Sequence, residues 1–338
     1  MKALIWVADG KMKIEDVPEP EPREGWVLLR VSQTGICGSE VSAYLGLNEL
    51  RRPPLIMGHE FSGTVEKTVG VENEMEGKLV AVNPLVTCGK CTFCISGLRN
   101  LCPHRQIVGA AFQGSFAEFV CVPADSCYPV GNPMCGALAE PLATAIRAVD
   151  RCNLATDDRA MVFGMGIIGL FILKLLRYKG VRECIVADLN EQRLRTARAS
   201  GASHVINMSG KKATEEMLKY FNGGVDFSFD AAGVETTRSY CISVLRSGGK
   251  AVFVGNHDNT TRIDGNTVVR REITVEGSYA YTDKEFQRSV KLAETDFIGS
   301  SPEWLTVRSL KEGPTIFSEL ASNKIPYSKV ILKSWGKG

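Results

Sequence analysis

Four cysteines in one short segment have the spacing of a closed metal site. The segment contains Cys88-x-x-Cys91-x-x-Cys94, and Cys102 follows shortly afterwards. Four thiolates hold zinc tetrahedrally and leave no open position, which is the arrangement of structural zinc. An iron–sulfur cluster and free thiols are the alternatives. We predict a structural zinc that fixes this lobe, at about residues 86–104, and takes no part in chemistry.

Cys37 and His59 could contribute to a second metal site of a different kind. A thiolate and an imidazole together suit zinc, although two ligands do not complete a site. Glu60 directly follows His59, and Glu140 is a more distant acid that could supply the third ligand. Taken singly, a cysteine or a histidine at such a position is more often an ordinary core residue.

A glycine-rich turn predicts a site for a dinucleotide. Gly164, Gly166 and Gly169 have the spacing G-x-G-x-x-G, between the apolar run Met161–Phe163 and a helical pattern from Ile167 to Tyr178. The first glycine allows a tight turn, the second lets the backbone approach a pyrophosphate, and the third lets the helix pack closely on the sheet. The pyrophosphate would lie at the helix N-terminus, where Ile167 and Ile168 begin the helix.

Asp188 ends the next predicted strand, Cys184–Ala187. A carboxylate at this place accepts hydrogen bonds from a ribose diol, whereas it would repel a 2′-phosphate, so we predict NAD rather than NADP. An isolated G-x-G-x-x-G turn also occurs in other α/β proteins. The strand before it, the helix after it and the acid at the next strand end together favour the dinucleotide interpretation.

The elements around this turn alternate between strands and helices, which predicts a doubly wound parallel sheet. Helical patterns lie between most of the strands, at residues 192–199, 213–221 and 236–245. The predicted strands are 161–163, 184–187, 204–206, 225–230, 250–254 and 272–276.

The first part of the chain has the short apolar runs and turns of a β-rich domain, for example at Ala3–Val7, Trp26–Val31 and 114–122. An apolar helix near Ala143–Val149 leads to the glycine turn. After Gly277 there remain a helix at 284–293 and a strand at 330–332, which are too short to form a core of their own. We therefore predict a β-rich domain at 1–143, a dinucleotide domain at 144–277, and a return to the first domain at 278–338.

The composition is that of an ordinary soluble protein, with 23% charged and 44% hydrophobic residues in a chain of 338. The net charge of +2 gives no reason to expect nucleic acid or a membrane surface as a partner. The apolar run at the N-terminus, Ala3–Val7, is too short for a signal peptide. The 11 cysteines are therefore expected to be metal ligands or free thiols in a reducing cytoplasm.

Taken in order, these motifs resemble the zinc-dependent medium-chain dehydrogenases, which include alcohol, polyol, threonine and butanediol dehydrogenases. The resemblance covers nearly the whole chain and implies a GroES-like β-rich catalytic domain plus a Rossmann domain, assembled as a homodimer or homotetramer. Its motifs are GICGSE around Cys37, GHEFSG around His59, the four-cysteine segment, GSFAEF, AEPLAT around Glu140, the glycine turn and AAG at 231–233.

The resemblance also implies a role for each residue of the first metal site. Cys37 and His59 would be ligands of a catalytic zinc, with Glu140 as the third ligand, directly or through water. Glu60 would be the neighbouring acid that can exchange onto the metal, and Ser39 would hydrogen-bond the alcohol. Zinc as a Lewis acid lowers the pKa of a bound hydroxyl, and hydride then passes to the nicotinamide.

On the cofactor side, the resemblance places Thr144 and the strand end Val254–Gly255 beside the nicotinamide. Arg193 would reach the adenosine ribose beside Asp188. The implied reaction interconverts a small-molecule secondary alcohol, vicinal diol or polyol with its ketone.

Two departures from the family pattern concern the proton and the substrate. Ser42 stands near the place where many relatives carry a histidine that passes the proton on, so the relay would end in water, a cofactor hydroxyl or Ser42. Ala280 replaces an arginine of the sorbitol-type enzymes, and the segment Gly277–Tyr281 is closer to butanediol dehydrogenases. Aromatic residues that either line the substrate pocket or pack in the core are Tyr44, Phe112, Tyr279 and Tyr281.

Several other functions remain open from the sequence. An L-threonine dehydrogenase and a polyol-phosphate dehydrogenase are alternatives within the family, and the latter needs a basic group such as Arg51, Arg52 or Arg105. A non-catalytic NAD-binding or redox-sensing protein is an alternative of another class. A zinc-independent quinone reductase is disfavoured by Cys37, His59 and the cysteine lobe.

Overall fold

The computed structural model describes residues 1–71, 74–209, 217, 223–299 and 302–334, and the chain forms two compact units. The first unit contains Met1–Glu140, Thr282–Ile325 and Lys329–Gly338, and the second contains Pro141–Tyr281 and Pro326–Ser328. The sequence predicted the boundaries after residues 143 and 277, whereas the units divide after Glu140 and Tyr281.

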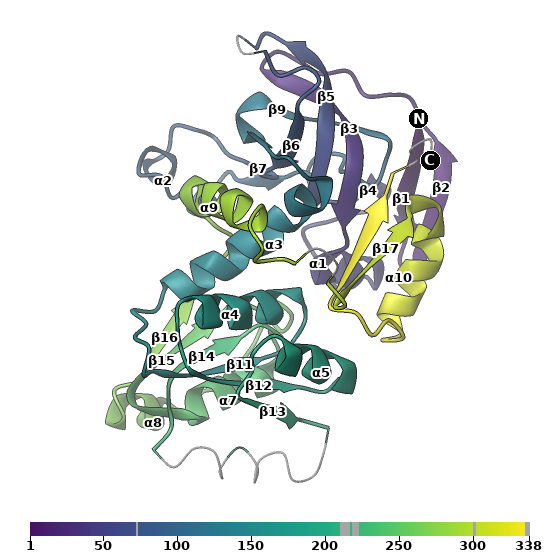
Figure 1. Cartoon of the computed structure of the whole chain (residues 1–338). Helices are drawn as coiled ribbons and strands as arrows, with labels where there is room; N and C mark the ends of the chain where they lie inside the picture. The colour runs from purple at the N-terminus through teal and green to yellow at the C-terminus, as the bar shows by residue number, and fades with distance from the viewer. Residues whose placement is uncertain (72–73, 210–216, 218–222, 300–301, 335–338) are drawn as a thin grey trace. The chain divides into compact units, whose positions relative to one another are not determined.

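The second unit is built on a parallel sheet of six strands in the order β13-β12-β11-β14-β15-β16 (Figure 1). The chain starts in the middle of this sheet, winds to one edge, and returns to build the other half. This is the doubly wound order that places a cofactor crevice beside the first strand. The strands are β11 (Arg159–Phe163), β12 (Glu183–Asp188), β13 (His204–Asn207), β14 (Val225–Asp230), β15 (Leu245–Phe253) and β16 (Thr274–Gly277).

The predicted parallel sheet is therefore confirmed, with strand ends that differ by a few residues. The helices of this unit include α4 (Ile167–Tyr178), α5 (Glu191–Ala199), α7 (Glu235–Ser243) and α8 (Gly265–Arg270). The helix predicted at 213–221 lies almost wholly outside the described residues. The core of the sheet is apolar because β11 and β12 are buried on both faces, as parallel strands are when helices cover them.

The first unit is β-rich, as predicted, and its largest sheet has seven strands. Six of them run in the order β10-β6-β5-β3-β18-β17, and β9 pairs with β3. The strands are β3 (Trp26–Gly35), β5 (Glu60–Val69), β6 (Leu79–Val82), β9 (Phe119–Pro123), β10 (Cys127–Pro129), β17 (Leu305–Ser309) and β18 (Lys329–Lys333).

Smaller sheets and short helices complete the first unit. One sheet has the order β2-β1-β4, and the other pairs β7 with β8. These strands are β1 (Lys2–Ala8), β2 (Lys11–Asp16), β4 (Leu55–Ile56), β7 (Leu85–Val86) and β8 (Gln106–Ile107). The helices are α1 (Gly38–Tyr44), α2 (Thr92–Ile95), α9 (Asp283–Ala293), α10 (Gly313–Ala321) and the first part of α3 (Pro133–Asp150), with short 3-10 turns at Arg99–Leu101, Ala124–Ser126 and Leu310–Glu312.

The C-terminal part of the chain returns to the first unit. Strand β18 pairs with β3, and α10 packs its Phe317 ring against Tyr44 and Phe116. The sequence analysis predicted the return and the last strand but did not identify β17 or α10. The exception is the segment Pro326–Ser328, which belongs to the second unit. There the Ser328 hydroxyl donates to the carbonyl oxygen of Met165 (3.1 Å).

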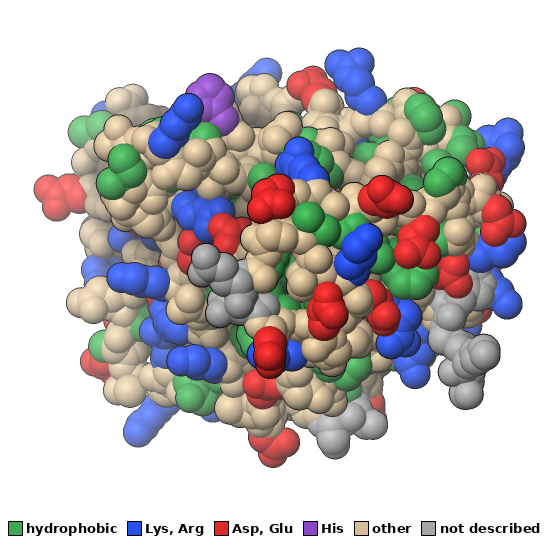
Figure 2. All heavy atoms as spheres, turned by 90° about the horizontal axis from the view of Figure 1, so that it is seen from above, with side chains coloured by type: hydrophobic (Ala, Val, Ile, Leu, Met, Phe, Trp, Pro, Cys, Tyr) green, Lys and Arg blue, Asp and Glu red, His purple; other side chains and the backbone are tan. Residues whose placement is uncertain are grey.

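Acidic and basic side chains are interspersed over the face seen in Figure 2, in keeping with the small net charge. None of the helices in the described residues combines the length and the hydrophobicity that spanning a membrane requires.

Candidate metal centres and cofactor site

Cys37, His59 and Glu60 come together in the first unit. One ligand atom from each lies within 4.8 Å of the others. Cys37 caps the N-terminus of α1, directly after strand β3, and Glu60 begins strand β5, which pairs with β3. His59 and Glu60 are buried, while Cys37 is partly exposed. A soft thiolate, an imidazole and a carboxylate at this separation fit a zinc ion with an open position.

Glu40 determines how His59 is presented to this site. Its buried carboxylate accepts hydrogen bonds from His59 Nδ1 (2.8 Å), from the amide of Gly58 (2.8 Å) and from the amide of Cys37 (2.9 Å). Because Nδ1 donates to Glu40, Nε2 is the nitrogen left to bind a metal. One carboxylate therefore orients both ligand-bearing segments.

Glu40 and His59 each change the pKa of the other. Burial raises the pKa of the Glu40 carboxyl, but His59, Arg51 and the amide of Cys37 together outweigh it, so the pKa lies below its usual value. Burial lowers the pKa of His59, but Glu40 and Cys37 outweigh it and raise the pKa well above its ordinary value. The protein without metal therefore favours a charged pair, and a metal at Nε2 would displace a proton.

Arg51 is a second buried charge beside His59. Its Nε donates to the carbonyl oxygen of Gly109 (3.0 Å), and its Nη2 lies 3.4 Å from His59 Nδ1. Since Nδ1 already donates to Glu40, the Arg51 contact acts through its charge, which favours ionised Glu40. The sequence analysis considered Arg51 only as a phosphate-binding residue.

Lys329 is a buried residue near the metal ligands that the sequence analysis missed. Its ammonium group forms an ion pair with Glu60 Oε2 and donates to the carbonyl oxygen of Ile36 (2.9 Å). Burial disfavours the ammonium, but Glu60 and Cys37 outweigh that effect and raise the pKa of Lys329. A lysine as the first residue of the buried strand KVILK was the one signal that could have identified it.

Glu140 lies on α3 and is half-buried, and its carboxylate does not belong to the Cys37–His59–Glu60 group. The structure therefore brings together three of the four predicted catalytic-zinc ligands. Ser39 lies on α1, two residues after Cys37, and is half-buried.

The four-cysteine lobe has the geometry of a tetrathiolate site. The sulfur–sulfur distances are 3.5 Å for Cys91 and Cys94, 3.6 Å for Cys88 and Cys102, and 3.9 Å for Cys88 and Cys94. Four sulfurs at about 2.3 Å from a tetrahedral zinc would be about 3.8 Å apart. The amides of Lys90 and Cys91 lower the pKa of Cys88 to about 6, which favours the thiolate that a metal needs.

Arg99 ties the lobe to the C-terminal part of the first unit. Its Nη1 lies 3.2 Å from Asp283 Oδ2, at the start of α9, and its Nε donates to Thr87 Oγ1 (2.8 Å). Asn83 donates to the other oxygen of Asp283 (3.1 Å). The lobe is thus attached through charged side chains as well as through its own backbone.

The glycine turn of the second unit fits the predicted role of each glycine. Gly164 has a φ of +87° and connects β11 to the turn. A Cβ on Gly169 would lie only 1.8 Å from the carbonyl oxygen of Gly164, so only glycine allows α4 to approach the sheet this closely. A Cβ on Gly166 would meet no atom within 4 Å, which leaves open space at the N-terminus of α4 for a pyrophosphate.

Asp188 lies at the carboxyl end of β12 beside this turn. It accepts hydrogen bonds from the amides of Met165 (2.5 Å) and Asn190 (2.7 Å). Nearby, α5 carries Arg193, whose Nε is buried and without a hydrogen-bond partner in the described part of the chain. A ligand is one group that could supply the missing hydrogen-bond acceptor.

The loops after β14 and β15 pack tightly against one another at the same edge of the sheet. A Cβ on Gly255 would lie 2.2 Å from the amide nitrogen of Gly233, in the segment AAG. Buried Asp230 holds this loop by accepting from the amide of Gly233 (2.9 Å) and from the Thr237 hydroxyl (2.7 Å). Val254 and Gly255 are therefore fixed where β15 ends. Thr144 lies on α3 and is half-buried.

Two of the four aromatic residues considered for the substrate pocket belong to the core. Tyr44 packs on Phe317, and Tyr281 is almost completely buried. Tyr279 is half-buried. Phe112 instead forms an edge-to-face pair with Trp26, at a ring separation of 5.4 Å.

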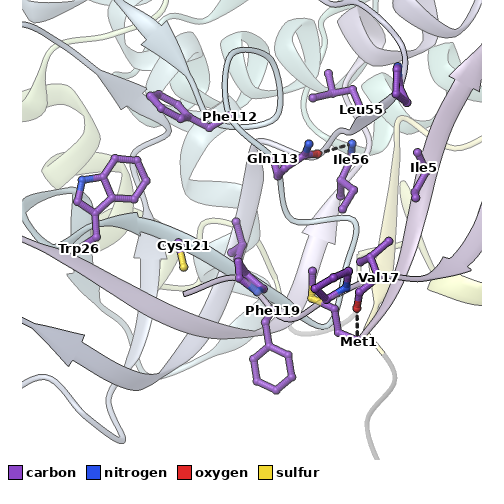
Figure 3. Close-up of a pocket in the computed structure, with 15 residues that line it drawn as sticks. Met1, Ile5, Val17, Trp26, Leu55, Ile56, Phe112, Gln113, Phe119 and Cys121 are labelled. Atoms are coloured by element: carbon purple, nitrogen blue, oxygen red, sulfur yellow. Dashed lines mark hydrogen bonds between the residues drawn. The ribbon is translucent and has the colours of Figure 1, made fainter. Parts of the chain in front are cut away.

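Phe112 and Trp26 line an apolar cavity of about 390 Å³ in the first unit (Figure 3). Leu55, Phe119 and Val120 also line the cavity, and Gln113 uses its side chain to accept from the amide of Ile56 (2.8 Å). None of the predicted metal ligands lines it. This cavity is therefore separate from the candidate metal centre.

Comparisons with known proteins match both units. A family model described as the alcohol dehydrogenase GroES-like domain matches residues 23–132, and one described as zinc-binding dehydrogenase matches residues 168–295. The chain is 32% identical to a sorbitol dehydrogenase of Bacillus subtilis, over 84% of this chain and 83% of that protein. The chain belongs to the zinc-dependent medium-chain dehydrogenases. The resemblance seen in the sequence is thereby confirmed.

Solved structures of similar proteins extend over nearly the whole chain. A 2R,3R-butanediol dehydrogenase from Bacillus subtilis is 29% identical, with a TM-score of 0.87, over 98% of this chain and 99% of that chain. A zinc-binding dehydrogenase from Sinorhizobium meliloti, solved with NADP, is 28% identical, with a TM-score of 0.89 and 98% of both chains covered. This dehydrogenase is therefore a zinc- and nicotinamide-dependent oxidoreductase that acts on alcohols, with a GroES-like domain and a Rossmann domain.

Proposed function

We propose that this dehydrogenase uses NAD to interconvert a secondary alcohol, a vicinal diol or a polyol with the corresponding ketone. The observation that carries the proposal is the group formed by Cys37, His59 and Glu60, in a chain whose second unit has an intact dinucleotide turn. Two of the similar proteins are a sorbitol dehydrogenase and a 2R,3R-butanediol dehydrogenase, which supports a polyol or a diol as the substrate.

Each residue of the first unit has a distinct task in this proposal. Cys37 and His59 hold the catalytic zinc, and Glu40 orients both of them. A zinc ion there supplies a Lewis acid that lowers the pKa of the alcohol hydroxyl. Glu140 would complete the ligand set, directly or through water, and Glu60 is the neighbouring acid that can exchange onto the metal.

Ser39, two residues after Cys37 at the start of α1, would take the hydroxyl proton and pass its own hydroxyl proton to the next acceptor. The next acceptor is Ser42, on the same helix, a cofactor hydroxyl or water. Because position 42 is a serine rather than a histidine, hydroxyl groups would replace an imidazole relay there.

Asp188 supports NAD rather than NADP as the cofactor. Its carboxylate ends β12 beside the glycine turn, and a 2′-phosphate would meet its negative charge. Arg193 has a free Nε nearby and would bind the adenosine ribose. Gly164, Gly166 and Gly169 with the first residues of α4 would hold the pyrophosphate, and Thr144, Val254 and Gly255 the nicotinamide.

Cys88, Cys91, Cys94 and Cys102 hold a structural zinc in this proposal. Their separations fit a tetrahedron, and all four are free cysteines in the structure. Such thiolates persist under reducing conditions, which supports a cytoplasmic location.

The proposed assembly is a homodimer or a homotetramer. Strand β16 lies at the edge of the six-stranded sheet, and its Val275 is 37% exposed. An open, partly apolar edge strand is a surface that a second copy can extend.

A polyol phosphate is a poorer fit as substrate. Arg51, which lies beside His59, is buried and donates to Gly109, whereas Arg52 is exposed. The proposal therefore keeps to uncharged alcohols.

The test is a panel of alcohols, diols and polyols offered to the purified zinc-loaded protein with NAD or NADP, with reduced cofactor followed by absorbance. We expect turnover with at least one diol or polyol, and a preference of at least about tenfold for NAD. Turnover with NADP alone, or with phosphorylated polyols alone, would contradict the proposal.

A further inference from the structure

A buried ion pair crosses a strand of the main sheet next to the metal ligands. Glu60 and Lys329 each have side chains that are only 1% exposed, and they are joined through Glu60 Oε2 and the lysine ammonium. The ammonium also donates to the carbonyl oxygen of Ile36 (2.9 Å), one residue before Cys37. Lys329, on the C-terminal strand, thus contacts both segments that carry metal ligands, at Ile36 next to Cys37 and at Glu60 next to His59.

Gly35 creates the space for this pair. Strand β3 lies between β5 and β18, and Gly35 is opposite Glu60 on one side and Ile331 on the other. A Cβ on Gly35 would lie 2.4 Å from Glu60 Oε2 and 2.6 Å from Cε of Lys329. The lysine therefore reaches Glu60 across the one strand position where no side chain intervenes.

The pair matters because Glu60 is close enough to become a metal ligand. Its carboxylate belongs to the same group of ligand atoms as Cys37 and His59. An unpaired carboxylate buried beside a divalent cation would bind it, since leaving such a charge unpaired is costly. A fixed ammonium group on Oε2 offers that carboxylate an alternative partner.

We propose that Lys329 is a positioning residue that keeps Glu60 from binding the catalytic zinc permanently, so that one coordination position stays available to the alcohol. This inference rests on the proposed function of Cys37 and His59 as zinc ligands. Gly35 leaves the space through which the Lys329 side chain on the C-terminal strand reaches Glu60.

The experiment measures the metal as well as the activity. We compare the wild type with Lys329→Met, Lys329→Arg and the double variant Lys329→Met/Glu60→Gln. Lys333→Met is the matched control, because Lys333 is the exposed lysine at the other end of β18. The readouts are the rate of zinc release to a chelator, the visible spectrum of the cobalt-substituted protein, and kcat.

In Lys329→Met, Glu60 should become a lasting ligand. We expect zinc release from the catalytic site to slow by about tenfold, in the range that groups around metal ligands produce. The cobalt absorption should weaken as the coordination number rises, and kcat should fall. Lys329→Arg should stay close to the wild type, and Lys333→Met should not change.

The double variant makes the test decisive, because it removes the unpaired carboxylate and should return zinc release and the cobalt spectrum to near wild-type values. Unchanged zinc release and spectrum in a folded Lys329→Met protein would overturn the inference, as would an effect that persists in the double variant. If the wild type holds zinc only in the cysteine lobe, the proposed function fails instead, so the two failures are distinguishable.

Discussion

The two candidate metal centres of the first unit are built in opposite ways. The cysteine lobe takes its four ligands from Cys88 to Cys102, in an exposed segment with little regular structure. The centre at Cys37 and His59 is buried and depends on residues as distant as Lys329. The lobe can keep its geometry through its own turns, whereas the buried centre needs the whole sheet. We therefore expect substitutions at the two centres to have different effects.

The largest effect should follow from removing a ligand of the buried site. His59→Ala should lower kcat/KM by at least about a thousandfold, equivalent to about 4 kcal/mol of transition-state stabilisation. Steady-state kinetics measures this loss, and NAD binding, followed by fluorescence, should persist because the dinucleotide turn lies in the second unit. Loss of NAD binding together with activity would indicate unfolding rather than loss of the metal.

The next effect concerns the residue that orients His59. Glu40→Gln keeps the shape of the side chain but removes the charge that its two backbone donors and His59 share. We expect the affinity of the catalytic zinc to fall by about 10- to 100-fold, the usual effect of losing such a partner. Competition with a metal chelator measures this affinity. Zinc in the lobe should be held as tightly as before, and a parallel loss there would contradict the separation of the two centres.

The lobe should affect stability more than chemistry. Cys94→Ser should remove the structural zinc and lower the melting temperature by about 5 to 10 °C, since each kcal/mol shifts a protein of this size by about 2–4 °C. Differential scanning calorimetry measures the shift. The kcat of the remaining folded protein should stay within about threefold of the wild type. A loss as large as that of His59→Ala would show that the lobe takes part in catalysis.

The smallest effect is chemical and distinguishes Cys88 of the lobe from two thiols elsewhere in the protein. Burial raises the pKa of Cys127 and of Cys152 to about 12, while backbone amides lower that of Cys88 to about 6. At pH 8, Cys88 is then mostly thiolate and the other two are almost wholly protonated. After zinc is removed with a chelator, alkylation followed by mass spectrometry should modify Cys88 before Cys127 and Cys152. Equal labelling of Cys152 would contradict this order.

The same contrast explains how far the sequence alone could lead. The lobe and the glycine turn were predicted from spacing, because their function depends on residues that are close in the chain. The parallel sheet was predicted because strand and helix patterns alternate after Met161. Glu40 was part of a quoted motif, but its three hydrogen bonds depend on how α1 meets the start of β5.

Lys329 could not be assigned from the sequence, since its partner Glu60 is 269 residues away and is reached only across Gly35. Strands that pair over such distances leave no local pattern. For the same reason the contacts of Arg51 could not be predicted, because its burial against Gly109 and His59 is a property of the folded unit. The choice between Glu60 and Glu140 depends on the same distant contacts.

The measurement that tests the account most directly is the zinc content per chain of the wild type and of Cys37→Ser, purified side by side and determined by atomic emission. The account predicts about two zinc ions in the wild type and about one in the variant, which keeps only the lobe. Equal zinc contents in the two proteins would contradict the assignment of Cys37 to a second, catalytic zinc site.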